Sequence, residues 1–343
     1  MKTMKRILII KHGALGDVIR TSYILKGIYE KYPGVRIYWL TALDAVDLLR
    51  YNPYIFQIVT PKDNLSSLQE LSFDLVISLD EEIEILSVLS KLTYKNIIGA
   101  GLTKDNQPVY TDESAEWFDM GLISRFGKKR ADELKKENTR EHNQIMAAML
   151  DIKIEEPLFF NSPILEKEKS LIFPKDYFNI GLNSGAGSRW MSKQLDIRET
   201  INLIKGMLDL EISGKKTGMH LLGGMEENER NRKIIDNVSS DRLFDTGTEN
   251  TLLEFAAIIK SCDYVISSDS LALHLAISQK IRNLSFYAPT SAQEIGTFGS
   301  GVKVASLSDD YCTYRKDADN STITSERILQ TFREHLKSGG MVL

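Results

Sequence analysis

The sequence predicts an α/β fold of two domains, each built on a parallel β-sheet. The first observation is length, because 343 residues exceed the ~250–300 residues at which a single hydrophobic core stops growing. The second is that short runs of β-branched residues alternate with segments of helical periodicity, which is typical of parallel sheets covered on both faces. The third is that this alternation lapses once, near the middle of the chain, and then starts again.

In the first half, strands and helices are expected to alternate from the start. Residues 6–11 have the pattern of a buried strand, and residues 17–32 that of a helix which Pro33-Gly34 terminates. Further strands are expected at 36–41, 55–59, 73–79 and 95–98. The acidic Asp80-Glu81-Glu82 follows one of these strands, and we interpret it as a helix start.

The pattern lapses between residues 151 and 176, where three prolines and a charged run gather, so we interpret this stretch as a linker. Beyond it, strands are expected at 178–183, 217–222, 242–244, 264–267 and 283–287, and helices at 196–210, 226–238, 252–260, 271–278 and 325–337. We therefore expect an N-terminal domain at 1–165 and a C-terminal domain at 166–323. A closing segment at 324–343 could pack back on the N-terminal domain.

Composition and charge exclude several classes of protein. The chain is 42% hydrophobic and 26% charged, with a net charge of −4, so it is neither disordered nor generally attracted to nucleic acid. Two distant cysteines suit a reducing compartment and are too few for a thiolate zinc site. No run approaches the ~20 apolar residues of a membrane span. We expect a cytoplasmic protein, with peripheral contact to the inner face of the membrane left open.

The first candidate site is the loop that joins the first strand to the first helix. It comprises Lys11, His12, Gly13, Ala14, Leu15 and Gly16. Its glycines allow a tight turn and a close approach of the backbone to a ligand. Asp17 follows at the expected helix start, where its carboxylate suits either a helix cap or a catalytic base, and the spacing leaves both open. The GxGxxG fingerprint of dinucleotide-binding folds is absent.

A second candidate is the loop after the first strand of the second half. Its residues are Gly185, Ala186, Gly187, Ser188 and Arg189, with Lys193 a little further on. Small residues leave backbone N–H groups free to point at an anion, and the two basic side chains add positive charge just before a helix. We interpret this loop as a phosphate or diphosphate site, against the alternative of a flexible surface loop.

Two more strand-to-helix junctions carry polar residues. Asp269 and Ser270 precede the helix that Leu271 begins, and we expect Asp269 to cap that helix and both to face a ligand cleft. His274 lies inside the helix, and we interpret it as structural. At the other junction, after Gly223-Gly224, Glu226 suits either hydrogen bonds to a ribose diol or a capping role.

The stretch from Lys128 to Lys136 is locally basic. It has two interpretations: a solvated surface balanced by neighbouring acids, or a docking site for an anionic acceptor or a membrane. HExxH, GxSxG and cysteine pairs at zinc spacing are all absent from the sequence. Asp317-Ala318-Asp319 lies past the last expected strand, so we do not interpret it as a metal-diphosphate site.

Together these segments resemble glycosyltransferase family 9, the heptosyltransferase-like enzymes. The resemblance is carried by residues 6–18, 185–193, 222–226 and 268–276, followed by Tyr287-Ala288-Pro289-Thr290, in the order expected for the family. Leu271 departs from the family pattern, which frequently has glycine there.

The resemblance implies a GT-B fold, in which two Rossmann-like domains face each other across a central cleft. It also implies inverting, metal-independent transfer of a sugar, without a cofactor. The donor would be a nucleotide diphosphate sugar, typically ADP-L-glycero-D-manno-heptose. The acceptor would be a hydroxyl of a lipopolysaccharide core or a related surface glycan.

Carried over residue by residue, the resemblance makes Asp17 the catalytic base and Lys193 a ligand of the donor phosphates. It places Glu226 at the ribose and Asp269 at the transferred sugar. Two other readings stay open, a non-catalytic nucleotide-sugar-binding module and a family member with a different donor sugar. A nicotinamide-dependent oxidoreductase is disfavoured because both halves lack GxGxxG.

Overall fold

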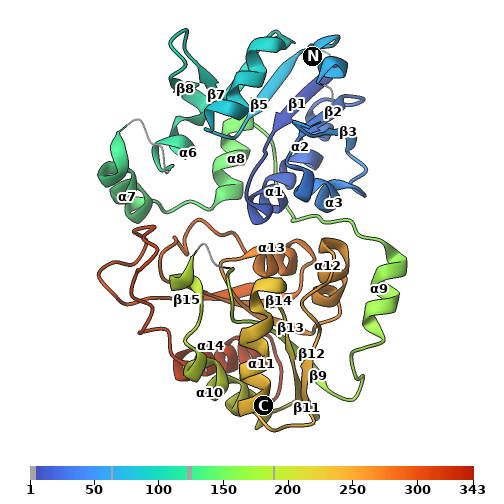
Figure 1. Cartoon of the computed structure of the whole chain (residues 1–343), viewed down its shortest axis with the longest axis vertical. Coiled ribbons are helices and arrows are strands. Elements are labelled where there is room, and N and C mark those ends of the chain that lie inside the picture. The colour runs from blue at the N-terminus through green and yellow to red at the C-terminus, as the bar shows by residue number, and fades with distance from the viewer. Residues whose placement is uncertain (1–4, 63–64, 122–125, 188–189) are drawn as a thin grey trace. The chain divides into compact units, whose positions relative to one another are not determined.

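The computed structural model describes residues 5–62, 65–121, 126–187 and 190–343 (Figure 1). Contacts divide the chain into two units, Met1–Phe160 and Asn161–Leu343. Each unit has its own parallel sheet, as the alternation predicts. Within the described residues, no helix combines the length and the apolar character needed to cross a membrane.

The first unit contains a six-stranded sheet and a two-stranded one. The strands are β1 (Arg6–Ile10), β2 (Arg36–Leu40), β3 (Ile55–Val59), β5 (Leu75–Ser78), β7 (Ile97–Leu102) and β8 (Pro108–Tyr110), with β4 (Ser72–Phe73) and β6 (Thr93–Tyr94) forming the small pair. The order in the large sheet is β3-β2-β1-β5-β7-β8. All neighbours in that sheet are parallel except β8, which runs antiparallel to β7.

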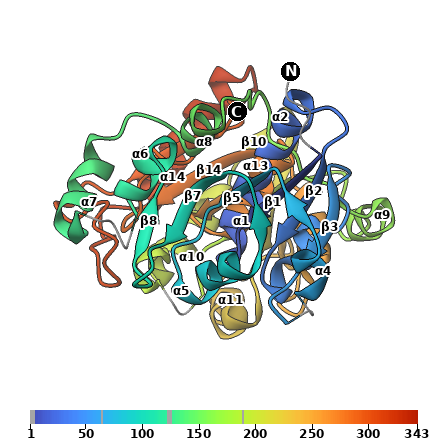
Figure 2. The same ribbon diagram turned by 90° about the horizontal axis from the view of Figure 1, so that it is seen from above.

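The helices of this unit cover both faces of its sheet. They are α1 (Leu15–Ser22), α2 (Ile24–Lys31), α3 (Val46–Leu49), α4 (Ser66–Gln69), α5 (Ile83–Leu86), α6 (Ala115–Asp119), α7 (Gly127–Glu137) and α8 (His142–Leu150). Because side chains alternate along a strand, Ile7 and Ile9 pack with α1, α2 and α8, whereas Leu8 and Ile10 pack with α4 and α5. Figure 2 shows α2 and α8 on one side of the strands and α4 and α5 on the other.

The helix expected at 17–32 is two helices. They meet at Tyr23, which keeps helical dihedral angles (φ −63°, ψ −20°) and caps both. The expected helix start at residues 80–82 is also wrong in part. The helix α5 begins at Ile83 with Glu82 as its N-cap, and Asp80 has a different role, described below.

The second unit contains a seven-stranded sheet. The strands are β9 (Phe178–Asn183), β10 (Glu211–Ile212), β11 (Lys215–Leu221), β12 (Leu243–Asp245), β13 (Tyr264–Ser268), β14 (Arg282–Tyr287) and β15 (Gly301–Ala305). The main order is β10-β11-β9-β13-β14-β15, and β12 pairs with β11. Only β10 is antiparallel to its neighbour. The strands β9, β11 and β13 are therefore adjacent, and their carboxyl ends share one edge of the sheet.

The helices of the second unit are α9 (Pro163–Ser170), α10 (Ile197–Leu208), α11 (Asn228–Asn237), α12 (Leu252–Lys260), α13 (Leu271–Ser278) and α14 (Ser325–Ser338). The expected linker thus contains a helix, because Pro163 occupies the first turn of α9, where proline favours helix formation. The closing helix α14 buries Ile328, Phe332 and Leu336 in the core of the second unit and contacts α10, β14 and β15. This packing makes α14 part of the second unit.

The ion pair between Lys169 and Glu254 makes the stability of the second unit depend on pH. Hydrogen bonds from Lys169 and from the N-cap Thr251 lower the pKa of Glu254 from its ordinary 4.5 to about 2. Between these values the unfolded chain binds the proton and the folded one does not, so stability falls as the pH drops from about 4.5 to 2. We expect Glu254→Gln to be less stable at pH 7 and to lose less stability over that range, as measured by urea unfolding. Parallel losses in the two proteins would contradict this.

Candidate functional site

In the first unit, the loop from Lys11 to Gly16 connects β1 to α1. Ala14 is the N-cap of α1 and has a left-handed backbone (φ 53°). Its carbonyl accepts hydrogen bonds from the N–H groups of Asp17 (2.8 Å) and Val18 (3.1 Å), which close the first helical turn. Asp17 is therefore the third residue of the helix. The N-cap is Ala14, so Asp17 does not have the capping role that was one of its two interpretations.

The carboxylate of Asp17 has defined neighbours within this unit. Its Oδ1 lies 2.8 Å from Nη2 of Arg20, whose guanidinium stacks over the ring of Trp117 at 5.2 Å. A small cavity of about 20 Å³ is lined by Lys11, Asp17, Arg20, Thr21, Leu79, Trp117, His142 and Met146. The carboxylate of Asp17 is thus held beside polar and aromatic groups, with about a third of its surface exposed (35%).

In the second unit, the buried carboxylate of Glu227, which the sequence pattern did not indicate, joins the loop of residues 185–187 to that of Gly223-Gly224. The Oε1 of Glu227 accepts a hydrogen bond from the N–H of Gly187, and its Oε2 accepts one from the N–H of Gly224, each at 2.9 Å. A Cβ on Gly185 would lie 2.3 Å from Cγ of Glu227, so only glycine fits there. The N–H of Gly187 is therefore bonded within the protein, contrary to the expectation that it is free for an anion.

Glu226 lies next to the same loop, on the solvent side. Its side chain is exposed, and a Cβ on Gly187 would lie 2.7 Å from its Oε2. The sequence pattern did not distinguish the two adjacent glutamates, because both follow Gly223-Gly224 and only burial separates them. Glu226 remains the member of the pair that solvent and a ligand can reach.

A largely buried ion pair forms the centre of this site, with the side chains of Lys193 and Asp269 15% and 12% exposed. Nζ of Lys193 lies 2.8 Å from Oδ2 of Asp269 and donates to its backbone carbonyl at 2.9 Å. Nε2 of His274 lies 3.4 Å from Oδ1 of Asp269. Burial alone would raise the pKa of the Asp269 carboxyl, but the Lys193 ammonium and His274 outweigh it and hold that pKa well below its usual value. Asp269 is therefore a buried carboxylate anion, positioned by two cationic or hydrogen-bonding partners.

The residues around Asp269 differ from the expectation in one respect. The N-cap of α13 is Ser270, so Asp269 does not cap this helix. The Oγ of Ser270 accepts a hydrogen bond from Nδ2 of Asn183 (3.0 Å) and lies 2.9 Å from Oγ of Ser267. Leu271 is the first residue of α13, and His274 is almost fully buried.

The structure brings most of the predicted donor residues to one edge of the second sheet. Gly185, Ala186, Gly187, Lys193, Glu226, Asp269, Ser270 and Leu271 follow β9, β11 and β13 or begin the helices after them. Ser188 and Arg189 lie outside the described residues. Arg230 of α11 was not predicted. Its Nε donates to Oγ of Ser184 at 3.0 Å, and its Nη2 donates to the carbonyl of Leu195.

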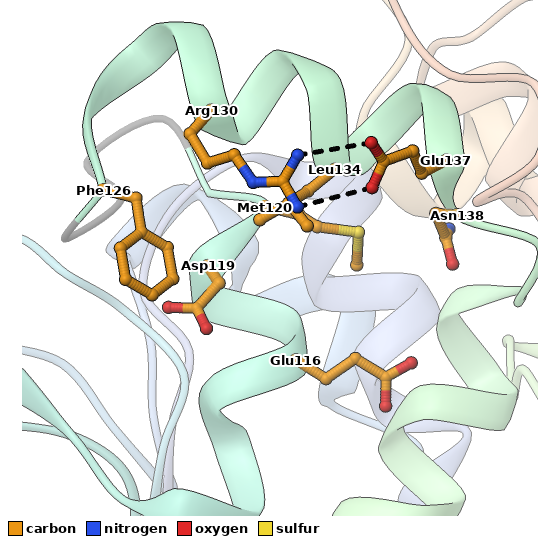
Figure 3. Close-up of a pocket in the computed structure, with 8 residues that line it drawn as sticks. All are labelled: Glu116, Asp119, Met120, Phe126, Arg130, Leu134, Glu137 and Asn138. Atoms are coloured by element: carbon orange, nitrogen blue, oxygen red, sulfur yellow. Dashed lines mark hydrogen bonds and ion pairs between the residues drawn. The ribbon is translucent and has the colours of Figure 1, made fainter.

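A separate cavity of about 460 Å³ lies in the first unit (Figure 3). It is lined by Glu116, Asp119, Met120, Phe126, Arg130, Leu134, Glu137 and Asn138. Figure 3 shows the guanidinium of Arg130 facing the carboxylate of Glu137, with hydrogen bonds of 3.2 and 3.4 Å. With three acids and one arginine, this lining favours hydroxyl or cationic groups over a polyanion.

The basic stretch at 128–136 is largely neutralised within α7. Lys128 pairs with Asp132 at 2.5 Å, and Arg130 pairs with both Glu133 and Glu137 at 3.2 Å. Such pairs favour the solvated-surface interpretation of this helix. Across the described part of the chain, His, Cys, Asp and Glu side chains do not gather in threes at a spacing that could hold a metal ion.

Part of the second unit matches the model of a known protein family. Residues 213–323 match the model of glycosyltransferase family 9 (heptosyltransferase). This match includes Glu226, Glu227 and Asp269 and confirms the resemblance that the sequence predicts. A search of curated protein sequences finds no match.

Solved structures resemble the whole chain. A family 9 glycosyl transferase from Veillonella parvula has a TM-score of 0.76 at 17% identity, over 98% of this chain and 99% of that one. The E. coli ADP-heptose lipopolysaccharide heptosyltransferase II has a TM-score of 0.70 at 15% identity, over 98% and 99%. The E. coli heptosyltransferase WaaC, solved with ADP-2-deoxy-2-fluoro heptose, has a TM-score of 0.62 at 15% identity, over 96% and 99%. At these identities the likeness establishes the fold, and it confirms the predicted GT-B fold class.

Proposed function

We propose that this chain is a glycosyltransferase of the family 9 type, which transfers a heptose from ADP-heptose to a hydroxyl of a lipopolysaccharide core or a related surface glycan. The observation that carries the proposal is the buried Lys193–Asp269–His274 cluster at the edge of the second sheet. The donors named for the E. coli proteins of similar fold support ADP-heptose.

The second unit would bind the donor. The ammonium of Lys193 would contact the diphosphate while remaining paired with Asp269, and the N-terminal end of α13 would add its partial positive charge. Glu226, which is exposed beside the Gly187 loop, would accept hydrogen bonds from the ribose diol. The Asp269 carboxylate would meet hydroxyl groups of the transferred sugar.

Transfer would proceed with inversion in a single displacement. The acceptor hydroxyl attacks the anomeric carbon opposite the diphosphate, its proton passes to the Asp17 carboxylate, and the bond from the anomeric carbon to the phosphate oxygen breaks. The leaving ADP gains negative charge, which Lys193 and the N–H groups at the start of α13 would stabilise. Because Lys193 and these N–H groups supply positive charge next to the leaving diphosphate, the step would require no divalent ion. It does require the base and the bound donor to meet during turnover.

The acceptor would bind through the first unit, which carries Asp17. The loop from Lys11 to Gly16 lies directly before this residue and would contact the acceptor near the reacting hydroxyl. With a glycolipid acceptor, the reaction would take place at the inner face of the cytoplasmic membrane, where peripheral contact would suffice.

Turnover separates this proposal from a non-catalytic nucleotide-sugar-binding module. Purified protein incubated with ADP-heptose and a heptose-deficient lipopolysaccharide acceptor should release ADP and extend the acceptor by one sugar. The rate should be unchanged after dialysis against EDTA. Tight donor binding without transfer would favour the binding module, and loss of activity with EDTA that added Mg²⁺ or Mn²⁺ restores would contradict the metal-independent step.

A further inference from the structure

A buried carboxylate of the first unit is hydrogen-bonded to the loop that precedes the proposed base, Asp17. Asp80 follows β5, and the N–H of Leu79 donates to the carbonyl of Ile10 at 2.9 Å, so the ends of β5 and β1 lie side by side. This places the Asp80 side chain, which is only 6% exposed, next to Lys11. Its Oδ1 accepts a hydrogen bond from Nζ of Lys11 at 2.7 Å, and its Oδ2 accepts one from the backbone N–H of His12.

The same loop is held from its other side by the neighbouring strand. Nε1 of the fully buried Trp39 donates to the carbonyl of Lys11 at 3.2 Å, and the N–H of Ala42 donates to the carbonyl of His12 at 3.2 Å. Lys11 and His12 are therefore fixed between the ends of β2 and β5. Only Gly13 separates them from Ala14, whose carbonyl starts the helix that presents Asp17.

Asp80 also determines the charge beside the base. Lys11 and Asp17 line the same small cavity, so we expect the Lys11 ammonium to turn toward the Asp17 carboxylate if Asp80 is lost. A charge-assisted hydrogen bond to a buried carboxylate is among the stronger ones in proteins. This bond keeps Lys11 paired with Asp80, so that the Asp17 carboxylate pairs with Arg20, whose Nη2 lies 2.8 Å from its Oδ1.

We propose that Asp80 is a positioning residue for catalysis, which fixes the Lys11–Gly16 loop and keeps the Lys11 ammonium away from the Asp17 carboxylate. The inference rests on the proposed function, since it assigns Asp17 the role of base. Asp80 itself contacts neither the donor nor the acceptor in this scheme. It acts through the loop and through Lys11.

The first test is Asp80→Asn, which keeps the shape of the side chain and removes its charge. We expect kcat to fall about 30–100-fold with the KM for the donor changed less than about threefold, because the second unit binds the donor. The double variant Lys11→Met with Asp80→Asn removes the uncompensated ammonium as well. We expect it to recover about tenfold in kcat over the single variant, since Lys11 can no longer pair with Asp17.

Asp74 provides a matched control in the same unit. Like Asp80, it accepts a hydrogen bond from a lysine, Nζ of Lys95 (2.7 Å), and its backbone partners are the N–H groups of Lys5 (2.7 Å) and Arg6 (3.2 Å). It does so at the opposite end of β1, away from Asp17. Asp74→Asn should lower the melting temperature and leave kcat near the wild-type value.

A wild-type kcat in Asp80→Asn would overturn the proposal, as would a double variant no more active than the single one. If Asp80→Asn alone does not fold, the double variant, which has no buried unpaired charge, takes its place. It should then fold with a kcat below wild type, and a wild-type kcat would overturn the proposal.

Amide hydrogen exchange gives a readout that is independent of turnover. Exchange at residues 12–17 should accelerate in Asp80→Asn and not in Asp74→Asn, and unchanged exchange there would overturn the proposal. A wild-type protein that transfers no sugar contradicts the proposed function instead, so the two failures are distinguishable.

Discussion

Asp17→Asn is expected to lower kcat by about 10²–10⁴-fold, the range that a positioned general base contributes. The amide keeps the size of the side chain and loses the ability to accept the proton of the acceptor hydroxyl. Donor affinity should be unchanged, because the proposed donor ligands all belong to the second unit. Steady-state kinetics with both substrates, together with donor titration by calorimetry, measures the two effects separately.

The control for this variant is Asp47→Asn. Asp47 pairs with Arg50 three residues later at 2.5 Å, as Asp17 pairs with Arg20 at 2.8 Å, and both lie in helices of the first unit. Asp47→Asn therefore loses the same kind of ion pair without touching the candidate site, and its kcat should equal that of the wild type. If Asp17→Asn also turned over at the wild-type rate, Asp17 would serve only the structure of α1.

The second large effect is expected for Lys193→Met. The loss of one charged hydrogen bond to the diphosphate should weaken donor binding about 10–100-fold, equivalent to about 1.5–3 kcal/mol. The same change leaves the buried Asp269 carboxylate with His274 as its remaining side-chain partner. Because removing one member of a buried ion pair is costly, we expect a loss of about 3 kcal/mol in the free energy of unfolding. Calorimetry and urea unfolding provide the two measurements.

Lys169→Met is the matched control for Lys193→Met. Lys169 pairs with Glu254 at 2.9 Å in the second unit, and the two side chains are 22% and 29% exposed. This variant should lose less stability, because its partner stays more hydrated, and should bind the donor as the wild type does. Equal donor affinity in Lys193→Met and the wild type would remove Lys193 from the donor site.

The sequence predicted those features that depend on local pattern. Alternating apolar runs predicted the strands near β2 and β9, and the small and charged residues after β9 predicted a loop that lies at the edge of the second sheet. The break at Tyr23 and the helix α9 escaped prediction for local reasons. Tyr23 keeps helical angles, and the prolines between residues 151 and 176 favoured a linker although one of them, Pro163, begins a helix.

The contacts that tie distant segments together could not be predicted from one sequence. Asp80 bonds to Lys11 across 69 positions and Lys193 to Asp269 across 76. Nothing in the local pattern around Asp80 distinguishes it from the start of a helix. Likewise, Glu226 and Glu227 differ only in burial, which the packing of the glycine loops determines.

The most direct measurement of the central claim is NMR of the product formed from ADP-heptose and the acceptor. A single displacement assisted by one base predicts a new glycosidic bond with an anomeric configuration opposite to that of the donor, and one ADP released for each bond formed. A product that retains the donor configuration, or release of ADP and free sugar without an extended acceptor, would contradict the account.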